Sequence, residues 1–164
     1  MRLLLLLASL TVLFGAEEHS APPLSQFTLH ESMTDIAARF GSGAHSVRGN
    51  GFAVLEFGDD SADHSDLGYE WVFYFDMPGG AIVSATHNSV AGASIKPYFP
   101  AEETRVHVYK NGSTTMSAMS RVLAGDRVLI AVGAANPESK CSQLVLIRRA
   151  ALKRFYPWIA KDLE

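Results

Sequence analysis

The densest group of side chains that could do chemistry lies at positions 58–68, with the sequence GDDSADHSDLG. Four of its side chains are candidate metal ligands: Asp60, Asp63, His64 and Asp66. Closely spaced carboxylates can surround a hard cation such as Ca²⁺, which takes oxygen ligands. The alternating acids and glycine of an EF-hand are absent, and an ordinary solvated acidic loop has the same composition. A Ca²⁺ site and a plain surface loop therefore remain alternatives, and no other cofactor is expected.

The sequence contains no short motif for nucleophilic catalysis, zinc-dependent hydrolysis or nucleotide binding, such as G-x-S-x-G, H-E-x-x-H, the P-loop or G-x-G-x-x-G. We therefore expect an exported, non-enzymatic binding or protein-interaction domain, whose partner is an unidentified protein or small ligand. The alternative is a small exported hydrolase, or a metal-binding protein, that uses the acidic loop. In the hydrolase the site residues would be Asp63, His64 and His107.

Two aromatic-rich strands supply the candidate binding residues. The segment YEWVFYFD at 69–76 alternates, so that Trp71 lies on one side of a strand and Tyr74 on the other. The segment RVHVYK at 105–110 alternates in the same way and places Tyr109 beside His107. We predict a binding surface around Tyr74 and Tyr109, with Trp71 as a further candidate; the alternative is that these rings are strand core.

Composition and charge exclude some partners. The 164 residues carry a formal net charge of −3, which does not suit a protein that binds duplex nucleic acid. Basic and aromatic side chains gather in the last seventeen residues, where a helix is predicted over 150–163 with a kink at Pro157. That helix could contact an anionic membrane surface. The alternative is that it packs its apolar side on a sheet.

The first sixteen residues have the pattern of a secretory signal peptide, with Arg2 followed by an apolar run and a small-residue pair before the acids at 17 and 18. We expect cleavage, a flexible leader over 17–28, and a periplasmic or extracellular product with one globular domain over 29–164. Cys141 is the only cysteine, so it has no intramolecular disulfide partner. It is interpreted as a small buried residue, with a free reactive thiol or an intermolecular bridge as alternatives.

The elements that must position these residues follow from hydrophobic periodicity. A helix capped by Ser32 is predicted over 32–40, and the segment 116–123 is ambiguous between helix and strand. Six strands are predicted, at 52–57, 69–76, 81–87, 105–110, 127–133 and 143–149. Most connections are too short for parallel crossovers. The expected fold is α+β: a single, mainly antiparallel sheet of about six strands, with N-terminal and C-terminal helices packed on one face.

The helix at 32–40, which ends in Arg39-Phe40-Gly41, and the three strands after it resemble small exported modules of the SmpA/OmlA and β-lactamase-inhibitor-like type. The resemblance covers residues 32–88. It implies helices against an antiparallel sheet and a role in binding other proteins, and it assigns no functional residue.

Overall fold

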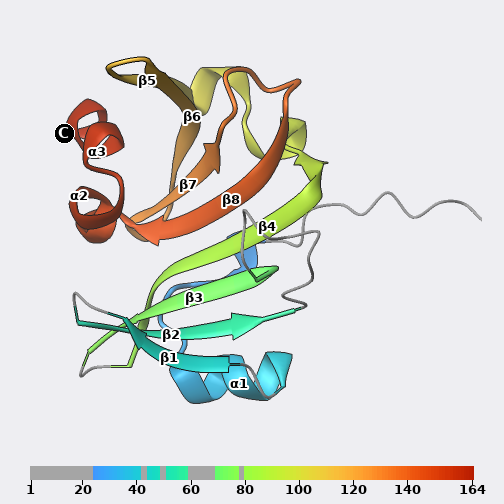
Figure 1. The fold of residues 1–164 in the computed structure, drawn as a ribbon, viewed down its shortest axis with the longest axis vertical. Helices are drawn as coiled ribbons and strands as arrows, with labels where there is room; N and C mark the ends of the chain where they lie inside the picture. The colour runs from blue at the N-terminus through green and yellow to red at the C-terminus, as the bar shows by residue number, and fades with distance from the viewer. Residues whose placement is uncertain (1–23, 42–43, 49–50, 59–68, 78–79) are drawn as a thin grey trace, which may run out of the picture.

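The computed structural model describes residues 24–41, 44–48, 51–58, 69–77 and 80–164, with the backbone alone at 44–48, 90, 91 and 93. Within these residues, eight strands form one antiparallel sheet in the order β1-β2-β3-β4-β8-β7-β6-β5 (Figure 1). The mainly antiparallel sheet with short helices is confirmed. The strands are β1 (Ala44–Arg48), β2 (Phe52–Phe57), β3 (Trp71–Asp76), β4 (Ile82–Ser94), β5 (Thr104–Asn111), β6 (Thr114–Leu123), β7 (Arg127–Val132) and β8 (Lys140–Arg148).

The predicted number of about six strands is wrong by two. The β1 strand was not anticipated, because its sequence AHSVR holds a single strongly apolar residue. The ambiguous segment at 116–123 is the β6 strand. In addition, β4 continues through Ser94, whereas the predicted strand ends at residue 87.

The sheet consists of two four-stranded meanders joined by one strand pair. Strands β1 to β4 follow one another in space, strands β5 to β8 do the same in reverse, and β4 pairs with β8 between them (Figure 1). The β4–β8 register shifts between Asn88 and Ala93. Gly92 lies in this irregularity with φ 71°, and a Cβ there would approach Lys140 Cβ to 3.0 Å. Glycine therefore permits the close approach of the two strands.

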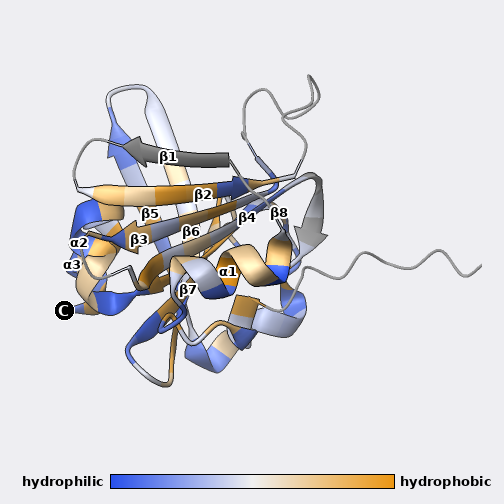
Figure 2. Cartoon of the chain, turned by 90° about the horizontal axis from the view of Figure 1, so that it is seen from below, coloured by the Kyte–Doolittle hydropathy of each residue, from blue (hydrophilic) through white to orange (hydrophobic). Residues whose placement is uncertain are grey.

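The first helix, α1 (Met33–Phe40), begins as predicted at Ser32. The Ser32 hydroxyl accepts a hydrogen bond from the backbone N–H of Asp35, and the Asp35 carboxylate accepts one from the backbone N–H of Ser32 at 2.8 Å. This capping box satisfies donors that a helix start leaves unpaired. The buried Ile36 and the Phe40 ring attach α1 to the sheet, and Figure 2 shows the helix lying against one side of the sheet.

The C-terminal segment forms two short helices, α2 (Leu152–Phe155) and α3 (Pro157–Leu163), preceded by a 3₁₀ turn (Arg149–Ala151). The predicted break at Pro157 is confirmed; proline has no N–H to continue α2 and is the first residue of α3. The apolar side chains of Leu152, Ile159 and Leu163 are buried.

The prediction that both terminal helices pack on one face is wrong. One face of the sheet, here called the α1 face, contributes residues such as Phe73 and Leu146 to a core that includes α1. The opposite face, the α2–α3 face, contributes residues such as Ile130 and Ile147 to a second core with α2 and α3. The central strands β7 and β8 are apolar on both sides, so each side needs its own cover.

The folded domain begins before residue 29, the start that the sequence predicts for it. Leu24 and Phe27 lie in the α1-face core, although the leader was expected to be flexible through residue 28. Arg127 donates a hydrogen bond from Nη1 to the Phe27 carbonyl at 2.7 Å, and Arg148 donates to the Leu29 carbonyl. These two strand arginines attach the N-terminal segment to the sheet. Residues 1–23, which include the proposed signal peptide, lie outside the described residues.

Candidate functional site

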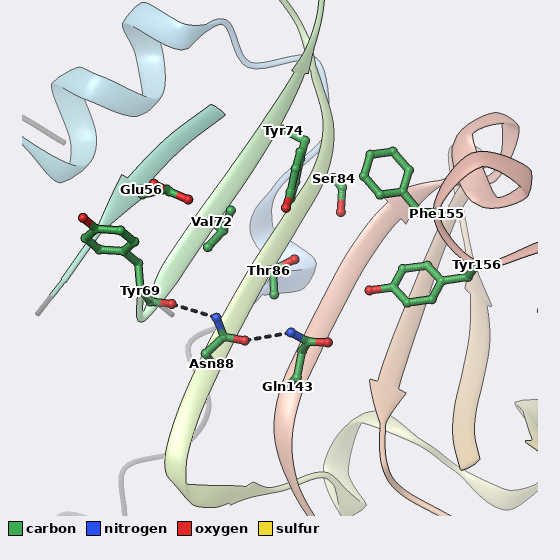
Figure 3. Close-up of a pocket in the computed structure, with 10 residues that line it drawn as sticks. All are labelled: Glu56, Tyr69, Val72, Tyr74, Ser84, Thr86, Asn88, Gln143, Phe155 and Tyr156. Carbon is green, nitrogen blue, oxygen red and sulfur yellow. Dashed lines mark hydrogen bonds between the residues drawn. The ribbon is translucent and has the colours of Figure 1, made fainter. Parts of the chain in front are cut away.

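A cavity of about 270 Å³ opens on the α2–α3 face, between strands β2, β3, β4 and β8 and the end of α2. Figure 3 shows the side chains from the four strands on one side and those from the C-terminal helices on the other. The described lining is mixed polar and aromatic: Glu56, Tyr69, Val72, Tyr74, Ser84, Thr86, Asn88, Gln143, Phe155 and Tyr156.

The floor of the cavity is polar because β4 alternates. Ser84, Thr86 and Asn88 point to the α2–α3 face, whereas Ala85 and His87 between them point to the α1 face, opposite Leu146 and Leu144 of β8. The three polar residues are buried, with 1%, 7% and 2% of their surface exposed. Buried hydroxyl and amide groups cost stability unless they are hydrogen-bonded. The cavity floor therefore concentrates polar groups in a position that a purely structural sheet would fill with apolar side chains.

Two amide side chains are fixed at one end of the cavity. Asn88 Nδ2 donates to the Tyr69 carbonyl at 2.7 Å, and Gln143 Nε2 donates to Asn88 Oδ1 at 3.0 Å (Figure 3). The chain of bonds joins β4, β8 and the segment just before β3. Hydrogen bonds of this kind hold side chains in one rotamer, which prepares a site for a ligand.

The opposite end is aromatic. Phe155 of α2 packs against Tyr74 with 5.2 Å between the ring centroids and against Phe52 with 5.0 Å. Tyr156 follows directly, and burial raises its pKa to about 12, with a smaller contribution from Tyr74. Its hydroxyl therefore stays protonated at neutral pH and is available as a hydrogen-bond donor.

The structure brings only one of the three predicted binding residues to this cavity, namely Tyr74. Tyr109 is on the same face of the sheet but packs against Trp158 of α3, with 6.0 Å between ring centroids. Trp71 points to the α1 face, where it is buried and stacks on Phe73 at 5.7 Å. The expected surface shared by Tyr74 and Tyr109 is therefore not formed as one patch, and Trp71 is a core residue.

The other cavity residues were not predicted from the sequence, although one signal was present. In SATHN at 84–88, polar residues recur at every second position, which marks one polar face of a strand. No comparable signal marks Phe155 or Tyr156, which reach the cavity through the fold of the C-terminal helices.

The acidic-loop candidates Asp60, Asp63, His64 and Asp66 lie outside the described residues. Elsewhere, in the part of the chain that the structure describes, no three His, Cys, Asp or Glu side chains gather as a metal-holding group. The Ca²⁺ hypothesis thus remains a prediction of the sequence.

A second polar constellation lies under α3. His107 Nδ1 is 2.6 Å from the Asp162 carboxylate and His107 Nε2 is 2.7 Å from Ser120 Oγ. Because a carboxylate only accepts, Nδ1 carries a proton, and the neutral ring can accept the Ser120 hydroxyl proton at Nε2. The order serine, histidine, aspartate is that of a nucleophilic triad. No local motif predicts it, since residues 107, 120 and 162 are far apart in the sequence.

The burial of this constellation favours a structural role. Ser120 and His107 are each 1% exposed, and neither lines a described cavity. Moving α3 to admit a substrate would carry Asp162 away with it, since that residue belongs to α3 itself. Uncovering the serine would therefore dismantle the triad. The contact ties α3 to the β5–β6 hairpin.

Two strand histidines, His87 and His107, lie on opposite faces of the sheet. His87 packs on Trp71 at 4.7 Å between ring centroids and pairs with Glu70 at 3.5 Å. Burial lowers the pKa of His87, and the Glu70 carboxylate partly offsets that effect. The hydrolase site of Asp63, His64 and His107 gains no support from this placement.

The basic tail makes contacts within the fold. Arg149 donates to the Leu163 carbonyl, and the Arg154 guanidinium lies 4.2 Å from the centre of the Phe52 ring. The helices pack their apolar side on the sheet through Leu152, Ile159 and Leu163. Contact of their basic side with an anionic membrane surface stays a prediction of the sequence. None of the helices in the described part of the chain combines the length and apolar composition that a bilayer crossing needs.

Cys141 lies in β8 and is buried in the α1-face core, which confirms its interpretation as a small buried residue. Burial raises the pKa of its thiol to about 11. The sulfur donates hydrogen bonds to the Gln143 and Val132 carbonyls. A thiol with this pKa is protonated at neutral pH and is a poor nucleophile.

Comparisons with known proteins find no match for this chain. No protein-family model matches it, and neither does any curated protein or solved structure. The resemblance of residues 32–88 to SmpA/OmlA-type modules stays a prediction.

Proposed function

We propose that this protein is an exported, non-enzymatic binding module whose small ligand occupies the cavity on the α2–α3 face. The observation that supports it is the pairing of a cavity of about 270 Å³ with buried polar residues on rigid strands, above all Ser84, Thr86 and Asn88. Ligand sites are typically concave, with a few fixed polar groups among aromatic and apolar ones.

The proposal is tested by filling the cavity. A library of small polar and aromatic compounds is titrated into the ¹⁵N-labelled protein while amide chemical shifts are recorded. Compounds that bind here are expected to shift the amides of residues 84–88 and 143. Thr86→Leu, which places a larger side chain in the cavity, should lower their affinity at least tenfold.

The matched control is Thr115→Leu, the same substitution on an exposed residue of β6. It should leave the affinities within twofold. Binding that survives Thr86→Leu unchanged, or shifts confined to another surface, would contradict the proposal.

Export is the second part of the proposal and is supported by the sequence of residues 1–16. The product recovered outside the cytosol is expected to begin at Glu17. An uncleaved chain found only in the cytosol, measured by intact mass and N-terminal sequencing, would refute it.

A further inference from the structure

The β5 strand forms one end of the described sheet, where it pairs with β6 on one side (Figure 1). Its register with β6 runs without a shift over all eight residues of the strand. The strand at the other end of the sheet, β1, has five residues. Natural sheets often protect an edge strand by making it short, by a bulge or by proline. The β5 strand is long and regular and contains no proline, so it is open to pairing with another strand.

The backbone of β5 directs hydrogen-bonding groups outward at every second residue. The Ser117 carbonyl of β6 accepts a hydrogen bond from the Gly133 N–H at 2.8 Å, so Ser117 directs its backbone groups toward the β7 side. Val108 lies opposite Ser117 and therefore directs its own N–H and C=O away from β6, to the outer edge. By the same alternation, Val106 and Lys110 do so too. These groups match those of an added antiparallel strand.

The side chains beside this edge are apolar and exposed. Val106 and Val108 are 52% and 59% exposed. They lie on the α1 face, since His107 between them contacts α3 on the other face. Val106 lies opposite Met119 of β6, which is fully buried in the α1-face core. The apolar α1 face therefore continues to the edge of the sheet, where a further strand would cover the two valines.

The order of residues in β5 is complementary to itself. In an antiparallel pair of two β5 strands with a two-fold axis at His107, Val106 of each copy lies opposite Val108 of the other. All four valines are then on one face, and the backbone groups that they direct outward face each other. Moving the axis by one residue would instead place a valine opposite Thr104 or Lys110.

The charged residues suit the same register. Lys110 of one copy lies opposite Thr104 of the other, two residues from the exposed Glu102. Arg105 lies opposite Tyr109 of the second copy, so neither cation faces a cation. Opposite charges on neighbouring strands stabilise a pair and like charges directly opposite destabilise it. The charge pattern therefore favours a second copy of this chain as the added strand.

We propose that β5 is a homodimer interface, in which the β5 strands of two copies pair antiparallel about a two-fold axis at His107. The sheet then continues from one copy into the other. An interface made of one strand pair is small compared with the roughly 1,200–2,000 Å² of stable complexes, so the dimer is weak and reversible. This inference does not depend on the proposed ligand or on export.

The test follows the apparent mass by small-angle X-ray scattering as the protein is concentrated from about 20 µM to about 1 mM. The mass should rise from that of a monomer toward that of a dimer. Val108→Lys places a charge opposite an apolar side chain and should weaken the dimer about tenfold or more. The matched control is Val122→Lys, since Val122 is 46% exposed and lies on β6 beyond the residues that pair with β5. The control should change the dissociation constant less than twofold.

A second variant tests the backbone pairing. Val108→Pro removes an N–H that points to the outer edge and leaves the hydrogen bonds between β5 and β6 in place, so it should also weaken the dimer about tenfold or more. Val108→Lys keeps the test valid if Val108→Pro does not fold. In a mixture of ¹³C-labelled and unlabelled chains, nuclear Overhauser effects between the methyl groups of Val106 and Val108 on different copies should report the register.

Three outcomes would overturn the proposal. The first is a protein that stays monomeric up to about 1 mM. The second is association that survives both Val108 variants, or that Val122→Lys weakens as much as they do, because the interface would then lie elsewhere. The third is association that Val108→Lys weakens and a folded Val108→Pro does not, which would show an apolar contact without strand pairing.

Discussion

The two faces of the sheet are built from the same strands but bury different chemistry. The α1 face holds a dry cluster of aromatic rings, including Phe27, Phe40 and Phe73 with centroids 5.1–6.2 Å apart. The α2–α3 face holds all but one of the buried polar side chains described, namely Glu56, Ser84, Thr86, Asn88, His107 and Ser120; the exception is His87.

The difference indicates that one face contributes mainly to stability and the other provides room for a ligand site. Apolar burial contributes about 25 cal/mol per Å², whereas buried polar groups are at best modest contributors to stability. The α1 face is therefore expected to carry most of the stability. Part of the α2–α3 face is occupied instead by the cavity, in which a ligand site is proposed, and by the hydrogen-bonded contact between α3 and the β5–β6 hairpin.

The sharpest test of this division uses neighbours in β3 that point to opposite faces. Phe73→Ala removes a fully buried ring from the aromatic cluster and should cost about 3–5 kcal/mol of unfolding free energy. Tyr74→Ala empties a half-buried position beside the cavity and should cost roughly half as much or less. Urea unfolding measures both, and equal losses would show that the two faces stabilise the fold alike.

The buried serine tests whether the polar link under α3 is structural. Ser120→Ala leaves His107 Nε2 without its partner and should cost about 1–3 kcal/mol. Ser117→Ala, in the same strand on the other face, should change stability by no more than about 0.5 kcal/mol. A fluorophosphonate probe should leave Ser120 unlabelled in the native protein. Labelling at Ser120 would instead favour a hydrolase.

The smallest expected effect concerns His87, the one buried polar side chain described on the α1 face. Burial lowers the pKa of His87, and the Glu70 carboxylate partly offsets this effect. The folded protein therefore binds a proton at His87 less readily than the unfolded chain does. The free energy of unfolding should therefore fall as the pH drops below about 6.5, the ordinary histidine value.

Urea midpoints at pH 7.5, 6.5 and 5.5 measure this dependence above the range in which ordinary carboxylates titrate. His87→Gln removes the titrating group and should flatten the curve. A His87→Gln curve as steep as that of the unmodified chain would assign the dependence to other groups.

The sequence predicts where the strands lie better than it predicts which side of each strand is buried. Alternation in β5 correctly separates Val106 and Val108 from His107, but it does not show whether the valines are buried. The structure exposes them at 52% and 59% because α3 covers the histidine side instead. Which side of a strand is covered depends on where distant helices pack, and local periodicity carries no information about that.

The candidate site is likewise only partly predictable from the sequence. The polar positions 84, 86 and 88 are visible in the sequence, but the cavity exists because β2, β3, β4 and β8 are adjacent and the α2 end lies beside them. The pairing of β4 with β8 joins residues 46 to 63 positions apart, from Ser94 with Lys140 to Ser84 with Ile147, and no short motif encodes it.

The pairing of β4 with β8 also matters during synthesis, because β4 is made well before β8. Until β8 leaves the ribosome, β4 has no neighbour on one side. An open strand edge of thirteen residues is a template for pairing with other chains. The nascent N-terminal meander is therefore the stage at which this polypeptide is most exposed to aggregation, and a product truncated before residue 140 would keep that hazard permanently.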